Sequence, residues 1–261
     1  MVQSGSREGK TVFSLELSAV DVVVERLDLP RHWQPFDVPH IGATVDERKR
    51  HVERVWEKLR SAGLAGPDRL NAETEQAMHT WTRPDLLVVV RADQVVGQRL
   101  VLYRAAAANG VGVLSELIGD QIEFDVFKAD RLIGEIVAQL PPLPPVPLRD
   151  VSITTGAPAP RDDPDSPLAH REPPSDMRAM RGFASWPVER FGSFELSIRN
   201  RAGRLAPAGV AQFVDTEGGR YVVFTTSLPN GQKRVSFVPS DGSHIRRWLH
   251  EQIAIAQEDR S

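Results

Sequence analysis

Histidines have the most varied chemistry in this chain, because a histidine side chain can bind a metal or transfer a proton near neutral pH. A helical zinc site of the HExxH type needs two histidines four residues apart, so that both rings leave one face of the helix. The seven histidines do not have this spacing: they are His32, His40, His51, His79, His170, His244 and His250. We therefore expect no metal site and interpret them as solvated or core side chains.

The other residue types that commonly carry catalysis also show no pattern typical of an active site. The chain has no cysteine, which excludes thiolate nucleophiles, thiolate metal sites and disulfides. It also lacks GxSxG, the motif that presents a serine nucleophile on a strand-turn-helix elbow. Glu116, Glu123 and Asp125 could pair for proton transfer, but solvated strand faces commonly carry such carboxylates. We expect a protein that is not an enzyme and holds no cofactor.

One glycine-rich segment also needs an interpretation. The sequence Asn-Gly-Val-Gly at 109–112 leads into an apolar stretch typical of a strand. A phosphate-binding glycine loop instead opens a helix, whose first amides then point at the phosphate. We interpret residues 109–112 as a hairpin turn.

Adaptable apolar side chains remain as candidates for a binding role. Met177, Met180 and Phe183 recur at three-residue intervals, which predicts one or two helical turns before Trp186. Trp248 lies on a predicted final helix. Methionine is common at adaptable docking surfaces. Packing in the core is the alternative for each of these residues, and the sequence leaves both open.

Composition and charge narrow the class of partner. The chain has 261 residues, 41% of them apolar, and a formal net charge of −3, so a uniformly basic surface for nucleic acid is absent. Apolar runs such as 86–90 are far shorter than the roughly 20 residues that span a bilayer. We expect a cytoplasmic protein that neither binds nucleic acid nor inserts into a membrane.

The elements that would position any site follow one pattern that occurs twice. In each copy, four short apolar strands are joined by tight turns and followed by an amphipathic helix, at about 86–140 and 191–255. The stretch 86–90 is apolar on both faces, which predicts a central strand. An apolar stripe over 132–140 closes the first copy as a helix. Each copy alone buries little surface, so we expect the two to pair about a pseudo-twofold axis.

Shorter elements precede the first copy. Phe13 and Leu15 alternate with polar residues and predict a strand, after which Ser18 is expected to cap a short helix. Thr44 and Glu47 form a capping box and open a longer helix. A further helix is expected to end before Pro84.

A change in composition separates the two copies. Five of the seven residues at 141–147 are proline, and 158–174 is rich in proline and aspartate. We expect a single domain of two halves, 12–140 and 186–257, joined by a flexible segment at 141–185.

Several segments resemble the EspG family, the cytosolic chaperones of mycobacterial and related actinobacterial ESX (type VII) secretion systems. The likeness lies in FSLELSAV at 13–20, VERVWEKLRSAGLAGP at 52–67, FGSFEL at 191–196, QFVDTEGGRYV at 212–222, residues 235–240 and the final helix. No single segment is a sharp motif, so specificity comes from their order and from the two halves. The resemblance implies an α/β fold of the α+β type, with a central, largely antiparallel sheet flanked by helices.

The resemblance also implies a partner. In that family such surfaces grip the hydrophobic tip of a PPE protein paired with its PE partner, so we expect a one-to-one complex with a PE/PPE heterodimer. We expect docking through the sheet face and a neighbouring hairpin. The expected contact residues are Asp93, Gln94, Val95, Val96, Gln98 and Leu100, with Met180, Phe183 and Trp248 as further contacts.

Two alternatives stay open from the residues alone. The cleft of a pseudo-twofold could hold a small molecule or an active site, in which case a deep polar pocket with converging titratable groups should lie between the halves. Exposed apolar edge strands could instead support a weak homodimer.

Overall fold

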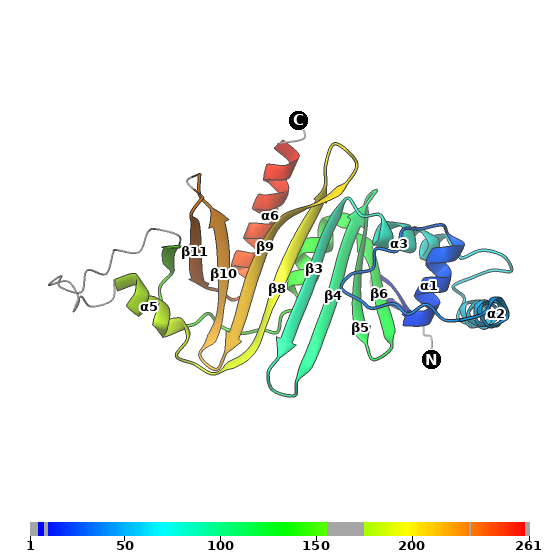
Figure 1. The fold of residues 1–261 in the computed structure, drawn as a ribbon, viewed down its shortest axis with the longest axis horizontal. Coiled ribbons are helices and arrows are strands. Elements are labelled where there is room, and N and C mark those ends of the chain that lie inside the picture. Colours follow the sequence, from blue (N-terminus) through cyan, green and yellow to red (C-terminus); the bar gives the residue numbers. More distant parts are fainter. Residues whose placement is uncertain (1–4, 8–9, 156–174, 230, 259–261) are drawn as a thin grey trace.

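The computed structural model describes residues 5–7, 10–155, 175–229 and 231–258, and these are organised around one antiparallel sheet (Figure 1). The strands are β1 (Gly5–Arg7), β2 (Lys10–Glu16), β3 (Leu86–Gln94), β4 (Arg99–Ala108), β5 (Val111–Ile118), β6 (Gln121–Lys128), β7 (Val151–Thr155), β8 (Val188–Arg199), β9 (Leu205–Thr216), β10 (Gly219–Ser227) and β11 (Lys233–Pro239). The helices are α1 (Leu17–Arg26), α2 (Val45–Ser61), α3 (Ala72–Thr82), the short 3-10 turn η1 (Ala129–Arg131), α4 (Leu132–Val137), α5 (Ser175–Phe183) and α6 (Ser243–Glu258).

The order of the strands confirms the expected repeat. The sheet runs β1-β2-β6-β5-β4-β3-β8-β9-β10-β11-β7, so β3 and β8, the first strands of the two copies, lie side by side at its centre. They pair antiparallel, with Val90 opposite Phe194. A twofold axis at this pair maps β3-β4-β5-β6-α4 onto β8-β9-β10-β11-α6. As expected, β3 is a central strand with apolar side chains on both faces.

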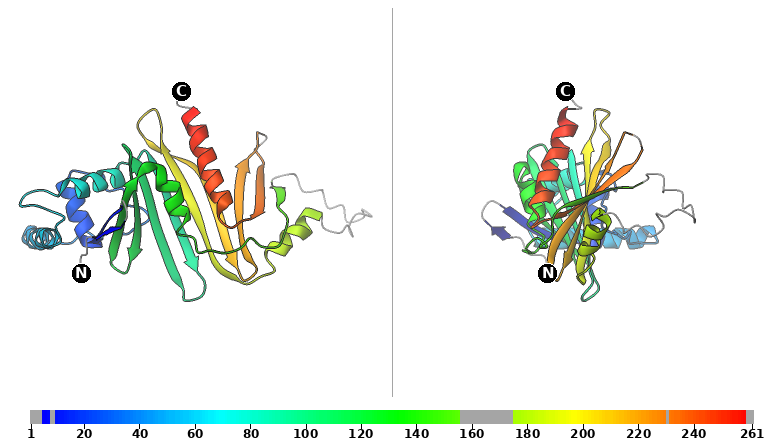
Figure 2. Two further views of the ribbon diagram at one scale, coloured as in Figure 1. Left: turned by 180° about the vertical axis from the view of Figure 1, so that it is seen from behind. Right: turned by 90° about the vertical axis from the view of Figure 1, so that its left-hand side faces the viewer.

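One face of the sheet is covered by α4 and α6, which lie next to each other (Figure 2). Alternate residues of the central strands point to this face, because side chains alternate between the two faces of a strand. They include Val88 and Val90 of β3 and Phe194 and Leu196 of β8, all at most 2% exposed. The helix α4 ends at Val137 rather than at residue 140.

On the opposite face, the described helices lie at the two ends of the sheet. Helices α1, α2 and α3 cover the β2, β5 and β6 end, where the Trp81 indole packs between Phe36 and Phe124. At the other end lies α5 (Figure 1). Its Phe183 packs against Tyr221 of β10 and Phe237 of β11. None of the described helices covers the middle of this face, which includes Leu87 and Val89 of β3, and we call it the open face.

Two helix caps were predicted, at Ser18 and at Thr44, and the structure confirms the second. Thr44 and Glu47 form the expected capping box of α2. The expectation that Ser18 caps the first helix was wrong, because α1 begins at Leu17, and its N-cap, Glu16, makes no side-chain cap hydrogen bond. The reason is that β2 runs directly into α1, and the Leu17 amide donates to the Asp120 carbonyl at 2.9 Å. A backbone acceptor thus takes one of the amides that a cap would otherwise satisfy.

The stretch 141–185 contributes structure at both of its ends. Its residues 151–155 form β7, which pairs with β11 at the edge of the sheet. Its residues 175–183 form α5, the helical turns predicted around Met180. Residues 156–174, which belong to the segment 141–185 that was expected to be flexible, lie outside the described residues. Among the described helices, none has the length and apolar character needed to cross a membrane.

Candidate docking surface

The hairpin between β3 and β4 presents apolar side chains to solvent. Residues 95–98 form its turn, which Gly97 and Gln98 close with positive φ angles of 87° and 47°. The side chains of Val95 and Val96 are 49% and 79% exposed. The Val95 amide donates to the Glu189 carbonyl at 2.9 Å, which fixes the hairpin against the start of β8. The tip is therefore an anchored projection with two β-branched apolar residues.

Neighbouring strands extend this apolar surface. Asp93 of β3 is paired with Leu100 of β4 on one side and with Phe191 of β8 on the other, so the three side chains leave the sheet on one face. That face is the open face, opposite to α4 and α6. Leu100 is 55% exposed and Phe191 is 47% exposed. Val188, which is 39% exposed, begins β8 next to Glu189, the residue that accepts from the Val95 amide. We call Val95, Val96, Leu100, Val188 and Phe191 the hairpin patch.

Directly behind the hairpin, on the face of α4, lies a groove of about 280 Å³. Its floor is apolar and includes Phe194 and Phe213, while Arg190, Tyr103 and Glu116 supply polar groups. Tyr103 donates to Glu116 across β4 and β5. Burial, helped by the charge of Glu116, raises the pKa of Tyr103 to about 12, and burial also raises the pKa of Glu116 above its ordinary value. We call this cavity the hairpin groove.

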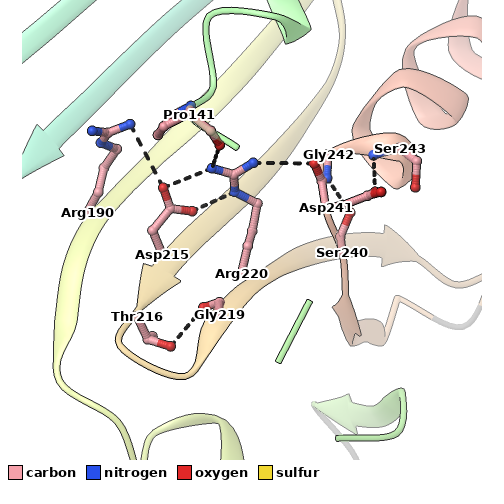
Figure 3. A network of polar contacts seen from close by, with 10 residues as sticks. All are labelled: Pro141, Arg190, Asp215, Thr216, Gly219, Arg220, Ser240, Asp241, Gly242 and Ser243. Carbon is pink, nitrogen blue, oxygen red and sulfur yellow. Dashed lines mark hydrogen bonds and ion pairs between the residues drawn. The ribbon is translucent and has the colours of Figure 1, made fainter. Parts of the chain in front are cut away.

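A buried ionic network lies beside this groove and ties the two halves together (Figure 3). The Arg220 guanidinium donates to both carboxylate oxygens of Asp215, and its Nη2 also donates to the Pro141 carbonyl at 2.9 Å. Pro141 follows the first half, whereas Asp215 and Arg220 belong to β9 and β10 of the second. Arg190, which lies opposite Gln94 of the hairpin strand, is 3.9 Å from the Asp215 carboxylate. The network thus joins the halves close to the hairpin.

The residues expected to bind a partner fall into two groups. Asp93, Gln94, Val95, Val96, Gln98 and Leu100 all lie on or beside the hairpin, as the sequence indicated. Met180 is half-buried on α5, and Trp248 is half-buried on α6, where its ring lies 6.1 Å from Phe224. These two side chains therefore lie on opposite faces of the sheet and do not join the hairpin residues.

The expectation that Phe183 contacts a partner was wrong. Its side chain is 2% exposed, and its ring lies 5.1 Å from Tyr221 and 5.6 Å from Phe237. It therefore packs in the core under α5, the alternative that the sequence left open, because α5 turns this side of its apolar stripe onto the sheet. We remove Phe183 from the candidate surface.

Two residues of the hairpin patch, Phe191 and Val188, were not among the contact residues expected from the sequence. A signal for Phe191 was available: Phe194, Leu196 and Ile198 alternate toward the core, so Phe191 falls on the other face, with Ser193 and Glu195. An aromatic residue on an otherwise polar strand face is a sign of a binding surface. Val188 gives no comparable signal.

One group of possible metal ligands is explained by ion pairs. Asp21, Glu25 and His40 bring their ligand atoms within 4.8 Å of one another. Arg48 contacts both carboxylates, with its Nη1 2.8 Å from Asp21 Oδ2, and His40 Nδ1 lies 2.9 Å from the same oxygen. Arg31 Nη2 also lies 3.5 Å from Asp21 Oδ1, so two arginines offset the two carboxylates, and Arg48 ties α2 to α1.

Together, the pseudo-twofold antiparallel sheet and the exposed apolar hairpin define an α+β protein with an apolar surface beside its central strands. The sequence profile of the EspG family matches residues 16–251, and the chain belongs to that family. A search of curated proteins finds no match.

A solved structure shares the fold. It is that of the Mycobacterium tuberculosis type VII secretion system chaperone EspG5 in complex with the PE25-PPE41 dimer. The likeness has a TM-score of 0.60 at 13% identity and covers 90% of this chain and 93% of that one. At this identity the match establishes the fold.

Proposed function

We propose that this protein is a cytoplasmic chaperone of a type VII secretion system that binds the hydrophobic tip of a PE/PPE-type heterodimer, one to one. The observation that carries the proposal is the hairpin patch: five exposed apolar side chains beside the central strand pair. Membership of the EspG family supports it. The fold shared with EspG5, whose structure includes the PE25-PPE41 dimer, supports it further.

The physics of this role requires no catalysis. A helical substrate with an exposed apolar tip would aggregate, and covering the tip with another apolar surface removes it from water. The hairpin patch suits this task because its residues are held by β-pairing and by the bond from Val95 to Glu189, so little ordering entropy is lost on binding. We infer that the protein acts by shielding and that 12–140 and 186–257 work as halves of one domain.

The hairpin groove supports a second candidate, the binding of a small molecule between the halves. Tyr103 and Glu116 come from one half, Arg190 and Phe213 come from the other, and titratable groups with shifted pKa values often mark binding sites. Its 280 Å³ lies just below the range of about 300–1000 Å³ that is usual for ligand pockets. The shielding role therefore ranks first.

Co-expression tests the first candidate. The protein is produced with PE/PPE pairs encoded near its gene, and the lysate is separated by size exclusion with light scattering. We expect one peak with the mass of a one-to-one complex with the heterodimer, and a soluble PPE protein only when the chaperone is present. Separate elution of the chaperone from every such pair would reject the proposal. The mass of the chain alone, across concentrations, tests the weak homodimer.

A further inference from the structure

A second, larger groove lies on the open face, away from the hairpin patch. It has a volume of about 1090 Å³ and runs between the loop that follows α1 and the hairpin that joins β8 to β9. Its floor is apolar, with Leu87 and Val89 of β3 and Leu205 of β9. Trp33 and Phe36 form part of the wall that the loop provides. We call it the open-face groove.

The two surfaces lie at opposite ends of the same strand. Leu87 is near the start of β3, and Gln94 ends the strand at the hairpin. Seven steps of an antiparallel strand extend about 24 Å. One partner at the hairpin patch and another in the open-face groove could therefore be bound at the same time.

The charges around the open-face groove are strongly one-sided. Its lining includes five arginines and one histidine: Arg31, His32, Arg83, Arg104, Arg199 and Arg204. Glu195 is the sole acid among the lining residues, and Arg91 Nη1 already holds it at 2.8 Å. Arg199 is likewise paired with Asp85, and Arg31 lies 3.5 Å from the Asp21 carboxylate, so Arg83, Arg104 and Arg204 are the lining arginines without a carboxylate partner among the described residues. The remaining balance is positive, which favours an anionic occupant.

Arg104 is a buried arginine at this groove, and its burial is energetically unfavourable. Its side chain is 1% exposed, and its guanidinium donates only to backbone carbonyls: to Gln34 at 2.6 Å from Nη1, and to Trp81 at 2.7 Å from Nη2 and 3.2 Å from Nε. Within the described chain, no carboxylate forms an ion pair with it. Burial lowers the pKa of Arg104 to about 9. A buried cation without a counter-charge is unfavourable, so an anion in the groove would offset the burial.

We propose that the open-face groove is a second docking site, which takes an acidic, partly apolar polypeptide segment of another protein. Carboxylates of that segment lie near Arg83 and Arg204, and its apolar side chains pack against Trp33 and Leu205, which are half-buried in the groove. The size of the groove, larger than most small-molecule pockets, and its mixture of a cationic rim with an apolar floor fit a peptide. This site goes beyond the proposed function, because it does not use the hairpin patch.

The test selects peptides from a random phage-displayed library on the immobilised full chain and then measures a fluorescein-labelled winner by anisotropy. We expect winners in which aspartate or glutamate alternates with leucine or phenylalanine. The charge reversal Arg83→Glu with Arg204→Glu should weaken binding by about tenfold or more. The matched control is Arg246→Glu with Arg247→Glu, two exposed arginines on α6 across the sheet, and it should change binding by less than about twofold.

Several results would overturn the proposal. If the library yields no peptide, or only neutral or basic peptides, the groove does not bind an acidic segment. Equal weakening by the two charge reversals would show that net charge, not the groove, attracts the peptide. Displacement of the peptide by a short single-stranded oligonucleotide at lower concentration would assign the groove to nucleic acid. The groove variant should still co-purify with a PE/PPE pair, so failure here is separable from failure of the shielding role.

Discussion

Asp215 and Arg220 form a buried pair in which the Asp215 carboxylate accepts from Arg220 Nε at 2.6 Å and from Nη2 at 3.0 Å. The side chains are 4% and 1% exposed. The guanidinium also donates to the carbonyls of Pro141 and Asp241, which places one side chain between the end of the first half and the start of α6 (Figure 3).

Asp215→Ala should therefore be strongly destabilising. The substitution leaves the Arg220 guanidinium buried without its counter-charge, which costs about 3–5 kcal/mol in comparable pairs. Urea unfolding followed by circular dichroism measures the loss. Exposed Asp46→Ala on α2 is the control and should cost far less. A loss below about 1 kcal/mol for Asp215→Ala would mean that the network does not hold the halves together.

Glu116→Gln should stabilise the protein at alkaline pH. Burial raises the folded-state pKa of Glu116 above its ordinary 4.5, so the folded chain binds this proton more tightly than the unfolded chain does. The ionised carboxylate therefore lowers stability above its folded-state pKa, and this cost disappears as the pH falls below the ordinary value.

Unfolding free energies of Glu116→Gln and wild type, measured in urea across a pH series, check the sign. We expect the variant to be the more stable at about pH 8 and the difference to vanish near the ordinary pKa of glutamate. A difference that grows on acidification would contradict this explanation of the hairpin groove.

Gly192→Ala tests how tightly the two halves meet. A Cβ at Gly192 would lie 2.4 Å from the Arg91 carbonyl oxygen and 2.8 Å from the Phe213 ring, at the junction of β3 and β8. Such overpacking costs about 1–3 kcal/mol. The matched control is Gly134→Ala on α4, where a Cβ meets nothing within 4 Å and should stabilise the helix by about 0.5–1 kcal/mol. In thermal unfolding, the midpoint temperature should fall for Gly192→Ala and rise for Gly134→Ala. An unchanged midpoint for Gly192→Ala would mean that β3 and β8 are not closely packed at this position.

Much of this fold was predictable because local chemistry and tertiary context agree. The repeat, the central position of β3 and the capping box of Thr44 all follow from patterns that the structure preserves. The prediction that Ser18 caps α1 was wrong, because the Asp120 carbonyl accepts from the Leu17 amide in place of a cap. A local sequence pattern cannot indicate a neighbour so distant in the chain. The hairpin around residues 93–98 was predicted, and its contact with a partner stays a prediction, whereas Phe183 lies in the core, because helical spacing does not reveal which side of α5 meets the sheet.

The open-face groove could not be predicted from the sequence. Arg104 and Leu87 face it from adjacent strands, but Trp33 and Arg204 reach it from a loop and a hairpin that are far apart in the chain. Arg104 lies within an apolar run of β4, which signals a buried cation, yet the identity of its partners depends on the tertiary fold.

The most direct test of the central claim is the affinity of the chaperone for a purified PE/PPE pair after the hairpin patch is made acidic. Val96→Asp with Leu100→Asp places charges where we expect apolar contact and should weaken binding by at least about thirtyfold in titration calorimetry. The control, Ile41→Asp with Val45→Asp, changes two exposed apolar residues elsewhere and should leave affinity unchanged. Wild-type affinity in the correctly folded hairpin variant would contradict the account.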